Sequence, residues 1–188
     1  MKILKWSVIL LLVLAAAIAA FLGYMGVFSS VKVEEKEMGP YTLVYESFVG
    51  PYSQTGAVFT RVYESLKADK IATRNGIGIY YDDPSKVSQD RLRSDCGCLI
   101  DSKDIEKVKR LGNKYKLKTI KKNLSMVAEF PIRNSLSYMI GPMKAYPALE
   151  AHMKKNGYFF QKNGRSAVPF ELYQMGSNRI LFVTEILK

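Results

Sequence analysis

The stretch Gly76-Ile-Gly-Ile-Tyr-Tyr-Asp-Asp-Pro84 has the pattern of a β-strand that ends in a turn. Side chains alternate across a strand, so Tyr80 and Tyr81 point to opposite faces of the sheet that contains it. The last three residues favour a turn, because aspartate can hydrogen-bond its own backbone and proline cannot donate to a strand ladder. A second aromatic strand is predicted at 168–174. Two such strands in one small domain predict a floor on which an apolar ligand could rest.

The predicted elements follow the order strand, helix, strand, strand, and this order occurs twice. The first set has a strand at 41–49, a helix starting at 55, and strands at 76–82 and 95–101; the second has a strand at 124–130, a helix ending at 155, and strands at 168–174 and 179–187. Each unit can bury its helix on one face of three strands, and two units side by side bury more. We therefore predict an α+β fold of duplicated β-α-β-β units with pseudo-twofold symmetry. A central groove between the units is the expected ligand site. The halves are 40–101 and 123–188, with a basic connector at 102–122.

An uncharged run of 23 residues, Trp6–Phe28, precedes this domain. As a helix it is long enough to cross about 30 Å of hydrocarbon. We predict one N-terminal transmembrane helix that is retained as a single-pass anchor at 1–28, then a polar stalk at 29–39 and the domain at 40–188. A cleaved signal peptide is the alternative, since Ala17-Ile-Ala19 resembles a cleavage site. The lysines before the run favour a cytoplasmic amino end, which places the domain outside the cytoplasm, in the periplasm if the source is bacterial.

The chain has 28 basic and 17 acidic residues, which gives a formal net charge of +11. This charge favours anionic neighbours such as lipid headgroups or acidic protein. We expect no nucleic-acid partner, because the signatures of nucleic-acid-binding modules are not found in the sequence. The connector at 102–122 is either a solvated basic face or a surface that docks on an anionic membrane.

Few residues of the sequence suit metal or nucleophilic chemistry. Cys96 and Cys98 are the two cysteines, and His152 is the one histidine. We interpret the cysteines as buried free thiols, because a bridge between such close neighbours would distort the strand and a metal site needs more ligands. We therefore expect no metal and no cofactor, and we find no Ser-His-Asp or Cys-His set.

Three stretches together resemble the GyrI-like family of small-molecule-binding domains: Gly50–Tyr52, Gly78–Pro84 and Phe170–Tyr173. Within that family the chain is most similar to a membrane-anchored branch that includes a testis-expressed ER-phagy receptor. The resemblance spans 40–187. It implies the duplicated fold with a central groove, in which an acidic residue and aromatic side chains receive apolar, often cationic, ligands. Some relatives in this family are similar to hydrolases that open cyclopropane rings by using groove glutamates.

Glu171 and Tyr173 alternate to the same face of their strand and are the leading candidates for the ligand site. A carboxylate beside a phenol ring can hold a cation. Tyr80 or Tyr81 would supply the matching floor from the first half, and an ordinary surface ion pair remains the alternative for Glu171.

Three functions remain open on this reasoning. The leading hypothesis is a membrane-anchored domain that binds a small apolar or cationic molecule, with the lipid membrane as a partner of its N-terminal helix. The second is a hydrolase of reactive electrophiles such as cyclopropanoids, with Glu171 as acid or base. The third is a membrane-tethered adaptor that binds protein or lipid.

Overall fold

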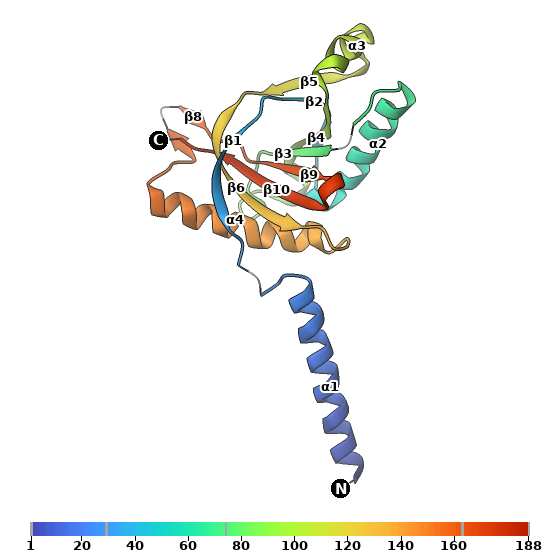
Figure 1. Ribbon diagram of the computed structural model, residues 1–188, viewed down its shortest axis with the longest axis vertical. Helices are drawn as coiled ribbons and strands as arrows, with labels where there is room; N and C mark the ends of the chain where they lie inside the picture. Colours follow the sequence, from blue (N-terminus) through green and yellow to red (C-terminus); the bar gives the residue numbers. More distant parts are fainter. Residues whose placement is uncertain (1, 29, 74, 163, 188) are drawn as a thin grey trace.

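The computed structural model describes residues 2–28, 30–73, 75–162 and 164–187 (Figure 1). The helices among these residues are α1 (Lys2–Tyr24), α2 (Thr55–Ala68), α3 (Ile105–Arg110) and α4 (Ser137–Asn156). The strands are β1 (Val33–Met38), β2 (Tyr41–Val49), β3 (Asn75–Tyr80), β4 (Arg93–Ile100), β5 (Lys116–Ile120), β6 (Asn123–Pro131), β7 (Gln161–Lys162), β8 (Arg165–Ser166), β9 (Phe170–Gln174) and β10 (Arg179–Glu185).

Eight of these strands form one antiparallel sheet in the order β1-β6-β10-β9-β3-β4-β2-β5. The unit β2-α2-β3-β4 and the unit β6-α4-β9-β10 contribute three strands each, in mirrored order about the centre. The centre is the β3–β9 pair, in which Gly78 lies opposite Glu171 and Gly76 lies opposite Tyr173. The predicted α+β fold of two duplicated units is confirmed, and the units meet where both aromatic strands lie side by side.

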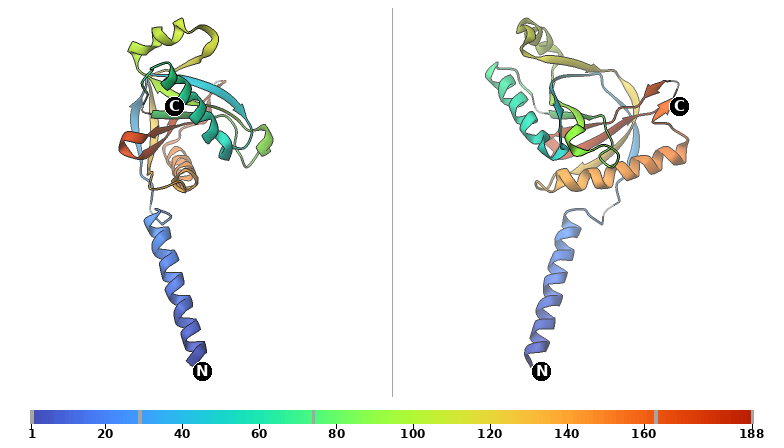
Figure 2. Two further views of the ribbon diagram at one scale, coloured as in Figure 1. Left: turned by 90° about the vertical axis from the view of Figure 1, so that its right-hand side faces the viewer. Right: turned by 180° about the vertical axis from the view of Figure 1, so that it is seen from behind.

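Helices cover one face of the sheet, and the other face is concave. On the covered face, α2 packs on β2 and β4, while α4 packs on β6 and β10 (Figure 2). On the concave face, Leu43 of β2 and Val127 of β6 belong to one buried cluster, although four strands separate them in the sheet. The sheet is therefore curled into a half-barrel. Side chains alternate between the two faces along a strand. The central strands therefore contribute both to the cluster on the concave face and to the clusters under the helices.

Two segments outside the predicted units contain strands of the sheet. The segment expected to be a polar stalk at 29–39 contains β1, which pairs with β6, and the connector at 102–122 contains α3 and β5, which pairs with β2. Both β1 and β5 are the outermost strands of the sheet, and both are rich in charge. Charged side chains are common on such strands because they discourage pairing with other chains. They also hide the apolar alternation by which a strand is predicted.

Helix α4 contains two prolines, Pro142 and Pro147. The helix begins at Ser137, so both prolines lie inside it. Each proline removes one N–H donor from the helix ladder. Every fourth residue of α4 from Ser137 to Met153 is buried, and this packing offsets the loss, since packing supplies most of the stability of a helix in a protein.

Helix α1 extends away from the sheet and its covering helices (Figure 1, Figure 2). Its residues Leu4–Tyr24 are long and apolar enough to cross a membrane, although a signal sequence would have the same character. The chain then turns, and Met25 is fully buried. The prediction of one apolar helix near the N-terminus is therefore confirmed.

Candidate functional site

Glu171 is a buried carboxyl group at the centre of the sheet. It lies on β9, on the face covered by helices, and only 5% of the residue is exposed. Its strand neighbours across the ladder are Gly78 on β3 and Phe182 on β10. Because Gly78 has no side chain, the Tyr80 ring lies over it, and a Cβ at Gly78 would come within 2.8 Å of the Tyr80 hydroxyl. An ordinary surface ion pair, the alternative for Glu171, does not agree with this burial.

Both oxygens of the Glu171 carboxyl group accept hydrogen bonds from phenols. The Tyr146 hydroxyl of α4 donates to Oε1 at 2.9 Å, and the Tyr173 hydroxyl donates to Oε2 at 2.6 Å. The Tyr80 hydroxyl lies 2.9 Å from that of Tyr173 and extends the network to β3. Within the described part of the chain, no salt bridge reaches Glu171. The group is thus hydrogen-bonded but has no counter-ion.

Further aromatic rings surround this network from both helices. The ring of Tyr52, just before α2, meets Tyr80 at 4.8 Å between centroids, and Phe59 of α2 meets Tyr173 at 5.2 Å. Tyr138 of α4 lies 5.9 Å from Tyr173. The site is therefore a buried acid of the sheet that is enclosed by aromatic rings, some of which come from α2 and α4. Such rings have electron-rich faces that attract cations.

Burial sets the proton affinity of the network. It raises the pKa of Glu171 to about 7, against the opposing effect of the hydrogen bonds from Tyr173 and Tyr146. Burial, together with the nearby Glu171 carboxylate, also raises the pKa of Tyr80, Tyr146 and Tyr173 well above the ordinary value. The phenols remain protonated donors at neutral pH, whereas Glu171 exchanges its proton there.

The structure brings together three of the four predicted site residues, Glu171, Tyr173 and Tyr80. Tyr81 is on the concave face, where its hydroxyl donates to Asp95 at 2.6 Å and accepts from Lys118 at 2.6 Å. The sequence left the choice between Tyr80 and Tyr81 open, and alternation along β3 decides it. Among the residues we missed are Tyr146 and Phe59. No local pattern links either of them to β9, since they come from helices distant in sequence.

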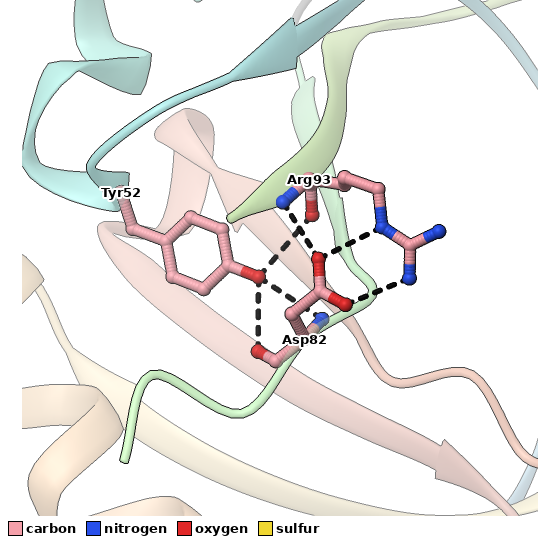
Figure 3. A network of polar contacts seen from close by, with 3 residues as sticks. All are labelled: Tyr52, Asp82 and Arg93. Carbon is pink, nitrogen blue, oxygen red and sulfur yellow. Dashed lines mark hydrogen bonds and ion pairs between the residues drawn. The ribbon is translucent and has the colours of Figure 1, made fainter. Parts of the chain in front are cut away.

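A polar clamp holds Tyr52 in place (Figure 3). The Tyr52 hydroxyl donates to the carbonyl oxygen of Asp82 at 2.9 Å and accepts from the Asp82 N–H at 3.1 Å. The Asp82 carboxylate in turn binds Arg93 through its guanidinium at 2.7 and 3.0 Å and through its backbone N–H at 2.7 Å. The Arg93 guanidinium lowers the pKa of Asp82. The turn predicted at 82–84 thus positions a ring of the aromatic wall.

The two cysteines lie close to this face and are not reactive. Cys96 and Cys98 are free and buried, as predicted. Burial raises the pKa of Cys96 to about 12 and that of Cys98 to about 11, so neither forms the thiolate that nucleophilic chemistry needs.

A separate cavity of about 300 Å³ lies on the concave face. Ile79 and Phe170 are among its apolar walls, and Lys118 and Lys121 are among its polar lining. It is on the opposite side of the sheet from Glu171. Any test of the Glu171 site must therefore distinguish binding on these two faces.

Comparison with known proteins supports the fold and leaves the activity open. No protein-family model matches the chain. Human testis-expressed protein 264 is 27% identical over 154 residues, covering 78% of this chain and 48% of that protein. The chain thus spans about half the length of this curated relative.

Solved structures give a clearer likeness. The C-terminal domain of EcmrR superposes with a TM-score of 0.56 at 14% identity, covering 84% of this chain and 98% of that one. SAV2435 bound to tetraphenylphosphonium superposes with a TM-score of 0.51 at 16% identity, covering 83% and 94%. These likenesses fit a GyrI-like fold, as the resemblance in sequence implied.

Proposed function

We propose that this chain is a membrane-anchored binding protein for small apolar cations, and that Glu171 neutralises the charge of the bound molecule. The observation that carries the proposal is a buried carboxyl group with aromatic walls and no counter-ion in the described part of the chain. A buried charge without a partner is costly, so an incoming cation supplies what the site lacks. The likeness to SAV2435 bound to tetraphenylphosphonium supports this choice of ligand class.

Binding couples to the loss of a proton from Glu171. Its pKa of about 7 means that the empty site is partly protonated at neutral pH. A cation between α2 and α4 stabilises the carboxylate and expels that proton. The phenols of Tyr146 and Tyr173, which hold the carboxylate in the empty site, must turn aside to admit the ligand. Their ring faces then contact the cation.

The experiment titrates the whole chain in detergent with tetraphenylphosphonium at pH 8 and measures the heat of binding by calorimetry. Glu171→Gln keeps the shape of the side chain and removes its charge, so we expect at least about tenfold weaker binding, a loss typical of a charged contact. Glu129→Gln is the matched control, because Glu129 lies on the concave face, partly exposed and paired with Arg179 at 2.9 Å. Equal affinity of the Glu171→Gln variant and the wild type would refute the proposal.

A hydrolase of reactive electrophiles is the second candidate, favoured by the same pKa of about 7. A carboxyl group with that pKa can donate and accept protons at neutral pH. Hydrolysis of a cyclopropane-containing compound would break one ring bond and add one water, which mass spectrometry detects. Turnover that the Glu171→Gln variant lacks would establish catalysis, whereas binding without turnover leaves the first proposal standing.

The location of the protein belongs to the proposal as well. We propose that α1 is retained as a single membrane span with the domain outside the cytoplasm, and that the chain has no nucleic-acid partner. Resistance of the full chain to alkaline extraction from membranes, together with protease access to the domain from the non-cytoplasmic side, is the expected result. Release of a shortened domain would instead identify α1 as a cleaved signal sequence.

A further inference from the structure

Helix α4 exposes apolar side chains on the face that points away from the sheet. Leu136 immediately precedes the helix, and Met139 and Met143 follow at helical spacing, with 59% and 69% of the two methionines exposed. The opposite face of the helix packs on the sheet through Gly141, Ala145 and other small or apolar residues. Helix α4 is thus apolar on two sides along its first half. An exposed apolar stripe of this kind commonly marks an interaction surface.

The start of α4 is fixed to the end of α1. The Asn134 side-chain amide donates to the Met25 sulfur at 3.1 Å, and Met25 itself is fully buried. The Arg133 guanidinium lies over the Tyr24 ring, 4.9 Å from its centroid. Residues 133 and 134 directly precede α4. These contacts set the first turns of α4 at the level where α1 ends.

The arrangement of the whole molecule agrees with this placement. In all three views, α4 is the helix of the domain that lies next to α1, while α3 lies at the far end of the domain (Figure 1, Figure 2). If α1 spans a bilayer, Tyr24 lies at its surface, where tyrosine is enriched. The basic connector around α3 is then remote from that surface. The alternative in which the connector docks on the same membrane does not agree with this geometry.

The net charge of α4 and of the residues just before it suits a lipid surface, although Lys154 and Lys155 lie in the last turn of the helix rather than beside the stripe. Arg133, Lys154 and Lys155 are exposed and Lys144 is half-buried, against one acidic residue of α4, Glu150, which pairs with Lys154 at 2.6 Å. Helices that lie in a membrane interface combine an apolar stripe with flanking lysine and arginine. Each basic residue near an anionic leaflet adds a favourable interaction with the lipid headgroups.

We propose that the first half of α4 lies in the headgroup region of the bilayer that α1 enters, with Leu136, Met139 and Met143 in contact with lipid. This inference rests on the proposed membrane insertion of α1. It gives the domain a fixed orientation on the membrane through two contacts. It also places α4, which carries Tyr138 and Tyr146 of the Glu171 site, beside the phase into which apolar cations partition.

The chain permits a sharp test because Trp6 is its one tryptophan. The full-length protein is reconstituted in vesicles of phosphatidylcholine and phosphatidylglycerol, with or without brominated acyl chains that quench nearby tryptophan. Met143→Trp and Met139→Trp are made separately in a Trp6→Phe background. Because the apolar face of an interfacial helix is buried about 5–10 Å into the headgroup and acyl boundary, we expect brominated lipid to reduce the emission of both variants by roughly half.

Two controls make the outcomes decisive. Leu111→Trp in the same background reports the exposed surface beyond α3, and we expect no quenching there. The wild type reports α1 through Trp6, which should be quenched. Quenched Trp6 with Met143→Trp and Met139→Trp no more quenched than Leu111→Trp would overturn the α4 contact and leave the anchor intact. Unquenched Trp6 would overturn the anchor and the α4 contact together. The proposed ligand binding would stand, because its titration is made in detergent and does not depend on either contact.

Discussion

At the scale of single residues, the molecule departs from ordinary protein chemistry at Glu171. Buried carboxyl groups are usually paired with a cation or a metal, whereas this one accepts hydrogen bonds from Tyr146 and Tyr173 alone in the described chain. Ionising Glu171 in this buried position without a counter-ion is energetically unfavourable. Under the proposed function, a ligand that brings a positive charge offsets this cost.

The raised pKa of Glu171 makes a prediction about stability. Below the unfolded-state pKa of 4.5 the group is protonated in both states, and its effect on folding does not change with pH. Between pH 4.5 and about 7 the unfolded chain ionises first, so stability falls as pH rises, by about 3 kcal/mol in total. Glu171→Gln removes this loss. Urea unfolding should show the variant gaining stability over the wild type from pH 5 to pH 8, and parallel pH profiles would contradict the assignment.

The residue scale also shows how far the sequence can predict a site. Alternation along a strand correctly put Glu171 and Tyr173 on one face, and it separated Tyr80 from Tyr81. It could not say which face the helices cover. Tyr146 was out of reach, because a contact between α4 and β9 depends on the packing of the two units rather than on local spacing.

At the scale of elements, the pairing of β2 with β4 depends on close approach of their backbones. Gly97 of β4 is an example, since a Cβ there would overlap the carbonyl oxygen of Val44 on β2. The β2–β4 pair would have to shift, and we expect Gly97→Ala to cost several kcal/mol, of about the size found for overpacked cores. Gly76→Ala is the matched control, because its Cβ would make ordinary contacts of 3.5 Å with Phe59 and Tyr173. Equal unfolding midpoints of the two variants would argue against this register.

The clamp between the 82–93 loop and the start of α2 makes a second prediction at this scale. Tyr52→Phe removes the hydroxyl that accepts from the Asp82 N–H and donates to the Asp82 carbonyl oxygen. An unsatisfied, partly buried N–H costs about 1–3 kcal/mol, so thermal unfolding should occur at a lower temperature. Tyr63→Phe on the exposed side of α2 should change stability by less than about 0.5 kcal/mol. A Tyr52→Phe variant as stable as Tyr63→Phe would mean that the clamp does not stabilise the loop.

Elements with strong apolar patterns were predicted well, and charged edge strands were not. The residues of β1, Val-Glu-Glu-Lys-Glu-Met, have no alternation that a sequence rule could detect. Their strand forms because β6 offers a free edge and because Lys36 pairs with Glu129 at 3.2 Å. Pairing with a distant strand therefore decides the conformation of this segment.

At the scale of the whole molecule, duplication explains where the site is. Two similar units place their third elements, β3 and β9, next to each other at the centre of the sheet, with α2 and α4 on either side. Small residues from the first unit, Gly76 and Gly78, lie opposite Tyr173 and Glu171 from the second. Neither unit forms the site alone. The order of elements in the sequence predicted the two paired units, even though the two halves share few identical residues.

The position of tetraphenylphosphonium in a structure of the complex tests the central claim most directly. We predict that it lies between α2 and α4, with its phosphorus facing the Glu171 carboxylate and the rings of Tyr146 and Tyr173 turned aside to receive it. Binding in the cavity of the concave face, beside Lys118 and Lys121, would contradict the account.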